Sequence, residues 1–187
     1  MNMRKLGVTI TTLGIITLGI IGAASLVIAA EKDKPIQFKP ANAQMKIFRV
    51  WVGDWNEVAS FTNGVKVKAK GSNRFVLGGH YLQSKFTIDL GKGKKLSHIM
   101  MFGWDAEKKK YRGWMFSSSG RSLASTGVWN AKKKELVTTS VADAKGLITK
   151  TTTRVTSRDE LRWDVVQIDK KGEVIPLVSG VDIRRKK

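Results

Sequence analysis

The stretch Val65-Lys66-Val67-Lys68-Ala69-Lys70 alternates small apolar side chains with lysines. Successive side chains of a strand point to opposite faces, so this period of two predicts a half-buried strand with a basic outer face. The same period returns elsewhere along the chain. The sets that share one face are His80, Leu82, Ser84, Phe86 and Ile88; Leu161, Trp163 and Val165; and Ile175, Leu177, Ser179, Val181 and Ile183.

Turn signals separate these runs at short, even intervals. They include Asn63-Gly64, Gly78-Gly79, Gly91-Lys92-Gly93, Ser119-Gly120 and Lys171-Gly172. They delimit about ten strands. Short strands with tight turns and no long helical insert predict an all-β, antiparallel up-and-down barrel, because closure removes the exposed edges. A two-sheet sandwich is the alternative.

The amino-terminal part of the chain carries a different signal. Arg4 and Lys5 precede an uncharged, largely apolar run over residues 6–30, which indicates export. Cleavage near Ala30 is one outcome. The other is retention of residues 6–30 as a membrane anchor, because the run is long enough to span a bilayer. Either outcome places the domain in the periplasm or outside the cell.

The expected domain plan follows from these signals. Residues 1–30 form the signal peptide or anchor, residues 31–45 a polar linker with Pro35 and Pro40, and residues 46–187 the barrel domain. At its start Ile47, Phe48 and Trp51 predict a short helical plug that closes one mouth. The chain has no cysteine, so core packing alone must stabilise it.

Charge is the strongest compositional feature, at a formal net value of +19. Such an excess favours polyanions and anionic membrane surfaces. Consecutive turns of a meander alternate between its two ends, so the lysine-rich turns are spread over both ends. A nucleic-acid groove would gather them on one face with aromatic residues between. We therefore expect an anionic envelope surface as a partner and no specific nucleic acid.

Four aromatic and glycine motifs occur in a fixed order. They are Gly53-Asp54-Trp55, Leu77-Gly78-Gly79-His80-Tyr81-Leu82, Phe102-Gly103-Trp104-Asp105 with Tyr111 and Trp114 beyond it, and Gly127-Val128-Trp129-Asn130. Over roughly residues 48–184 this order resembles a bacterial calycin-like (lipocalin-like) family of unknown function. The resemblance implies a barrel with an internal cavity for a small apolar molecule.

A neighbouring calycin group, the nitrobindin-like haem proteins, is distantly similar. Its members bind iron through a histidine late in the chain. Both histidines here lie early, and no histidine follows His98. We therefore expect no haem, and no cofactor of any kind.

Strand parity and side-chain type select the candidates for lining the lumen. Aromatic and methionine side chains suit an apolar ligand, although they can equally fill a small barrel. An inward histidine could orient a ligand, or simply be hydrogen-bonded in the core. Two histidines without a cysteine make a poor metal site. The candidate ligand-binding residues are His80, Leu82, Phe86, His98, Met100, Phe102, Trp114 and Trp163.

Nothing in the sequence forms a catalytic constellation. Nucleophile elbows, phosphate loops and dinucleotide fingerprints do not occur. Asp54, Glu57, Asp89 and Asp105 have no spacing that pairs them as acid and base. The sequence thus predicts an exported, non-enzymatic binding protein with an apolar or amphipathic ligand in its lumen. The alternative is a polyanion- or envelope-associated structural or adhesion module with a filled lumen, and a lumen-dependent enzyme or haem protein is a more distant third.

Overall fold

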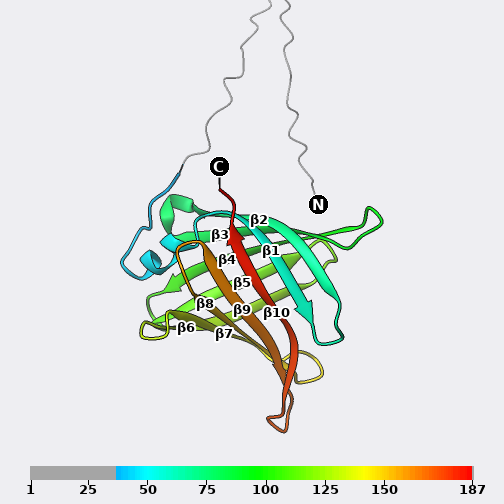
Figure 1. Ribbon diagram of the computed structural model, residues 1–187. Helices are drawn as coiled ribbons and strands as arrows, with labels where there is room; N and C mark the ends of the chain where they lie inside the picture. The colour runs from blue at the N-terminus through cyan, green and yellow to red at the C-terminus, as the bar shows by residue number, and fades with distance from the viewer. Residues whose placement is uncertain (1–36, 187) are drawn as a thin grey trace, which may run out of the picture. The chain divides into compact units, whose positions relative to one another are not determined.

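The computed structural model describes residues 37–186 as a closed antiparallel barrel (Figure 1). Ten strands follow one another around the ring, and β1 pairs with β10 to close it. This confirms the predicted fold class. The strands are β1 (Gly53–Phe61), β2 (Lys66–Val76), β3 (Tyr81–Asp89), β4 (Lys95–Asp105), β5 (Lys110–Ser117), β6 (Ser122–Asn130), β7 (Glu135–Ser140), β8 (Ile148–Val155), β9 (Glu160–Ile168) and β10 (Val174–Arg184).

The two-residue period of the sequence becomes the inside and outside of the ring. In β2, Ala69 is buried, Val67 is half-buried, and Lys66, Lys68 and Lys70 are exposed. In β9, Leu161, Trp163 and Val165 face the lumen. One-residue slips would turn these lysines inward, so the pattern also sets the register.

In the last strand, the residues that face the lumen are not the ones that its apolar sequence pattern suggests. Its pairing with β9 shifts between Pro176 and Val178, an irregularity that accommodates a residue without a backbone N–H. Beyond it, Val178 and Asp182 line the lumen, while Val181 faces outward. Ile183 is 46% exposed. The face that carries Val181 and Ile183 is therefore the outer one, and a carboxyl group points inward.

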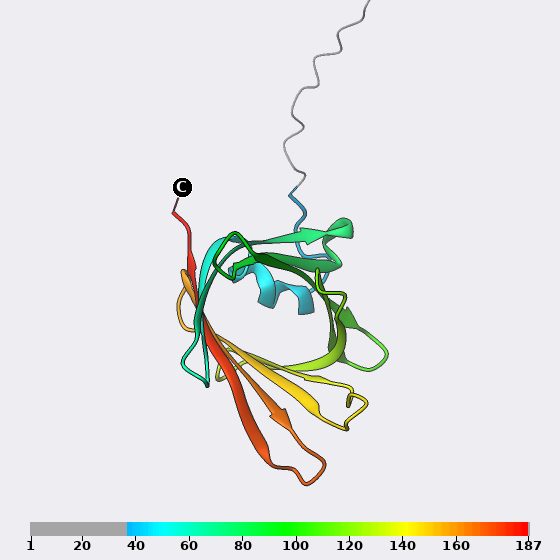
Figure 2. The ribbon, with the colours of Figure 1, turned by 90° about the vertical axis from the view of Figure 1, so that its right-hand side faces the viewer.

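One end of the barrel is closed by η1 (Gln44–Val50), a short 3-10 helix, which confirms the predicted helical plug. Figure 2 shows η1 within the ring of strands. Phe48 is fully buried and packs edge-on against Trp51 and Tyr111, with ring centroids 5.1 and 5.6 Å away. The Tyr111 hydroxyl donates to the Gln44 carbonyl at 2.9 Å. The plug is thus fixed by both apolar packing and a hydrogen bond.

The packed structure begins earlier than residue 46. Met45 is fully buried, and the Ala41 backbone N–H donates to the Gly79 carbonyl at 3.0 Å. Gly79 belongs to η2 (Leu77–Gly79), and a Cβ there would overlap the Lys39 carbonyl. Gly79 is therefore required by the close approach of the segment that leads into the plug.

The predicted export segment lies outside the described residues. Across residues 37–186, no helix has the length and apolarity needed to cross a membrane.

Candidate functional site: the barrel lumen

The ring of strands encloses a cavity of about 350 Å³. This lies at the lower end of the range of roughly 300–1,000 Å³ typical of small-molecule sites. The lumen is therefore not filled by its own aromatic residues. The walls come from most of the strands, and Trp51, just after the plug, contributes to the floor.

One wall of the cavity is apolar and polarisable. It is formed by β3, β4 and β5, whose inward positions carry aromatic and methionine side chains. Phe86 stacks on His98, with ring centroids 5.9 Å apart and planes 15° from parallel. Burial lowers the pKa of His98, so its imidazole is neutral at pH 7. The lining residues of this wall are Phe86, His98, Met100, Phe102, Trp114 and Met115.

The opposite wall carries two carboxyl groups. Glu57 of β1 and Asp182 of β10 are directly opposed across the strand pair that closes the ring, and they are 8% and 7% exposed. Burial, reinforced by the neighbouring charge of Asp182 and a hydrogen bond to it, raises the pKa of Glu57 to about 8. Burial also raises the pKa of Asp182 to about 6, although hydrogen bonds from Trp163 and Glu57 oppose the rise. At neutral pH the pair therefore holds one proton and about one negative charge.

Two polar atoms beside the cavity have no partner among the described residues. They are the Trp51 indole Nε1 and the Asn73 side-chain Oδ1, in residues 5% and 2% exposed. Both residues line the cavity. Buried donors and acceptors in proteins are nearly always paired, so an unpaired donor and acceptor together indicate a place for a polar group that the chain does not supply.

Trp51 is held in position from behind. Its carbonyl accepts the Trp55 indole N–H at 2.8 Å and the Asn73 amide N–H at 2.9 Å. Arg184, the last residue of β10, lies over the Trp55 ring with its guanidinium carbon 4.3 Å from the centroid. These contacts hold the backbone of Trp51 and the neighbouring Trp55 ring in place at the floor of the cavity.

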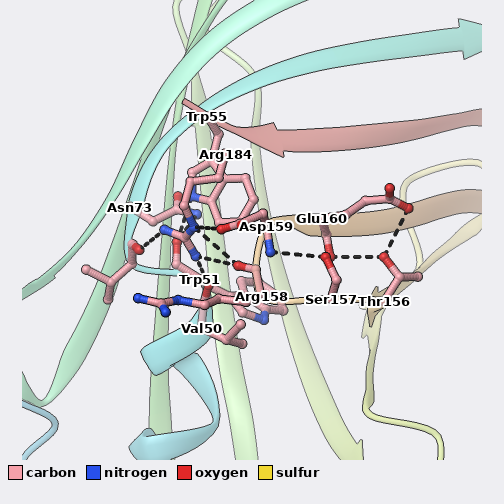
Figure 3. A network of polar contacts seen from close by, with 11 residues as sticks. Val50, Trp51, Trp55, Asn73, Thr156, Ser157, Arg158, Asp159, Glu160 and Arg184 are labelled. Carbon is pink, nitrogen blue, oxygen red and sulfur yellow. Dashed lines mark hydrogen bonds and ion pairs between the residues drawn. The ribbon is translucent and has the colours of Figure 1, made fainter. Parts of the chain in front are cut away.

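Arg184 is the centre of a larger network at the closed end (Figure 3). Its guanidinium donates to the carbonyls of Val50 at 2.6 Å and Arg158 at 2.9 Å, and to the Asp159 carboxylate at 2.9 Å. One arginine thus joins η1, the β8–β9 turn and β10. This network stabilises the end of the barrel opposite the open mouth.

The structure brings most of the predicted lumen residues together. Phe86, His98, Met100, Phe102, Trp114 and Trp163 all line the cavity. His80 does not, because it follows η2 as an exposed cap before β3 begins. Leu82 is fully buried in the core cluster around the plug, rather than on the cavity wall. The glycine pair 78–79 turns the chain just before the strand and so breaks the parity that placed His80 inside.

Sequence reasoning missed the polar half of the site. The sequence offers Glu57 no paired carboxylate among Asp54, Asp89 and Asp105, whereas the structure places it beside Asp182, 125 positions away in the chain. No pattern in the sequence singles out Asn73. A carboxylate among apolar residues of a strand is a signal for a buried acid. Its partner cannot be identified without knowing that β1 and β10 pair to close the barrel.

Fold and cavity together define a lipocalin-like barrel, closed at one end and hollow within. The chain belongs to the family described as "Protein of unknown function (DUF1579)", whose profile matches residues 41–184. This supports the resemblance to a bacterial calycin-like family; the nitrobindin-like relationship stays a prediction. No curated protein shows significant sequence similarity to the chain.

Among solved structures, the barrel is similar to Rv2717c from M. tuberculosis, with a TM-score of 0.58 and 12% identity over 78% of this chain and 99% of that one. It is also similar to the S-type phycobiliprotein lyase CPES from Guillardia theta, with a TM-score of 0.53 and 11% identity over 79% of this chain and 95% of that one. At such identities the likeness is one of fold.

Proposed function

We propose that the protein is an exported, non-enzymatic binding protein that holds a small apolar or amphipathic molecule in the barrel lumen. The observation that carries this proposal is the cavity of about 350 Å³, with its aromatic and methionine wall. Methionine side chains adapt to the shape of an apolar ligand, and a preformed cavity spares the cost of opening one. The cavity disfavours the structural module with a filled lumen.

Extraction of the purified protein with organic solvent, followed by mass spectrometry, tests for a retained molecule. In parallel, the neutral probe N-phenyl-1-naphthylamine should bind with increased fluorescence. Leu123→Trp, which fills the lumen from β6, should abolish this binding. Val128→Trp is the matched control, because it adds the same ring at an exposed position of the same strand. Equal binding by both variants would contradict the proposal.

The residues around the open mouth support the proposal that the protein associates with an anionic membrane surface. Its turns carry Lys92, Lys94, Lys145, Lys170 and Lys171, between exposed apolar residues at Leu90, Val141 and Val174. Lysines attract anionic lipids, and apolar side chains beside them can enter the interface. Co-sedimentation with phosphatidylglycerol vesicles, weakened by salt and absent with phosphatidylcholine, is the expected result.

Export is proposed from residues 1–30 alone. Edman sequencing of the protein recovered from its native host distinguishes a new amino terminus near Glu31 from an intact Met1.

A further inference from the structure

The charges of the lumen are opposite in sign to those of the exterior. The chain contains 34 lysines and arginines against 15 aspartates and glutamates. Yet the described residues that line the cavity include Glu57 and Asp182 and not a single lysine or arginine. The other group there that titrates near neutral pH is His98, on β4 across the lumen, whose pKa is lowered by burial. A ligand therefore meets only acidic charge inside.

No lysine or arginine among residues 37–186 forms an ion pair with either acid of the carboxyl pair. Across β9 its polar neighbour is the Trp163 indole, which donates to Asp182 Oδ1 at 3.2 Å. On the other side, Glu57 is paired with Ala69 of β2. Elsewhere in the barrel, the equally buried Glu135 receives the Arg154 guanidinium at 3.0 Å. Within the described part of the chain the lumen pair has no such cation, and buried carboxylates without one are costly.

We infer that the ligand is an amphipathic amine, whose ammonium group binds between Glu57 and Asp182 while its apolar body lies against the aromatic and methionine wall. This inference rests on the proposed binding function and specifies its ligand class. A donor or acceptor elsewhere on the ligand would meet the free Trp51 N–H and Asn73 oxygen at the floor.

Three probes of equal chain length separate the contribution of the charged headgroup to binding from that of the apolar chain. Octylamine, 1-octanol and octanoic acid should each displace N-phenyl-1-naphthylamine from the full-length protein at pH 7. We expect octylamine to bind about ten-fold or more tightly than the other two, because hydrogen bonds to ionised groups are the strong ones. In Glu57→Gln and Asp182→Asn this preference should fall below about three-fold, with octanol affinity retained. Glu135→Gln, at an equally buried glutamate on the outer face, should keep the preference.

A second measurement needs no variant. An ammonium between the carboxyl groups favours their ionised form, so octylamine should displace the shared proton to solvent. Calorimetric titrations at pH 7 in buffers of different ionisation enthalpy should therefore show release of up to about one proton with octylamine and none with octanol.

The outcomes separate the two proposals. Equal binding of octylamine and octanol, or a preference for octanoate, would overturn the amine inference and leave lumen binding intact. Displacement of the naphthylamine probe by none of the three would also overturn it. Failure of the naphthylamine probe itself to bind, together with no retained molecule, would overturn lumen binding first and the amine inference with it.

Discussion

The closed end of the barrel and the carboxyl wall of the lumen treat buried polar groups in opposite ways. At the closed end, Arg184 contacts three carbonyls and a carboxylate, and the Trp55 and Asn73 N–H groups share the Trp51 carbonyl. On the lumen wall, Glu57 and Asp182 share one proton, and no lysine or arginine of residues 37–186 lines the cavity beside them. The first arrangement stabilises the fold. The second costs stability, and such a cost indicates a function outside folding.

The largest expected effect on stability comes from disrupting the Arg184 network at the closed end. Arg184→Ala removes the ion pair with Asp159, the ring contact with Trp55 and the donors for buried carbonyls, so the free energy of unfolding should fall by about 4 kcal/mol. Urea denaturation measures it. Arg185→Ala is the matched control, because Arg185 contacts Gly71 and Asp54 only at 3.5 and 3.7 Å, and the loss should be within about 0.5 kcal/mol. Similar losses for both would show that the network does not anchor the plug.

The next prediction tests the carboxyl wall through pH. The folded state keeps the Glu57 proton up to about pH 8, whereas the unfolded state releases it above about 4.5. Native stability should therefore fall as pH rises through this window. The glutamine in Glu57→Gln does not titrate. The free energy of unfolding of this variant should therefore exceed that of the parent by roughly 2–3 kcal/mol at pH 8 and equal it near pH 4.5.

Urea denaturation at the two pH values checks this difference. Glu135→Gln provides the contrast, because it deprives Arg154 of an acceptor and should lower stability at both. A Glu57→Gln protein that is less stable than the parent at pH 8 would contradict the proposed cost of the carboxyl pair.

The smallest expected effect compares two buried indoles. The Trp55 N–H donates to the Trp51 carbonyl, whereas the Trp51 N–H has no partner among the described residues. Both Trp→Phe changes remove a similar area, so Trp55→Phe should cost about 1 kcal/mol more than Trp51→Phe. Thermal unfolding of the two variants measures the difference. Equal costs would indicate that the Trp51 N–H is paired in solution.

The fold could be predicted because its information is local. The alternation of side chains shows which face of a strand points inward, as in Val65–Lys70 and Leu161–Val165. Turn dipeptides mark where the chain reverses, as at Asn63-Gly64 and Lys171-Gly172. In a meander nearly every pairing joins neighbours in sequence. Local periodicity therefore specifies nine of the ten strand pairs, and closure follows from the need to cover two edges.

The apolar half of the site could be predicted for the same reason, and the polar half could not. Met100 follows from the parity of β4, which it shares with His98 and Phe102. Asp182 does not, because the irregularity at Pro176 and Val178 reverses the faces of β10 relative to its apolar pattern. Its proximity to Glu57 depends on the pairing of β1 with β10, which are far apart in the sequence. No local sequence pattern predicts the register of that pair.

The seam between β1 and β10 also links ligand binding to the order of folding. These strands lie at opposite ends of the domain, so their pairing closes the longest loop in the barrel and we expect it to form late. A growing chain, or one truncated before Val174, has two open edges and only one of the two acids. The acidic pair is therefore complete only once β10 has paired with β1, and a ligand that requires both acids would not bind to an incomplete barrel.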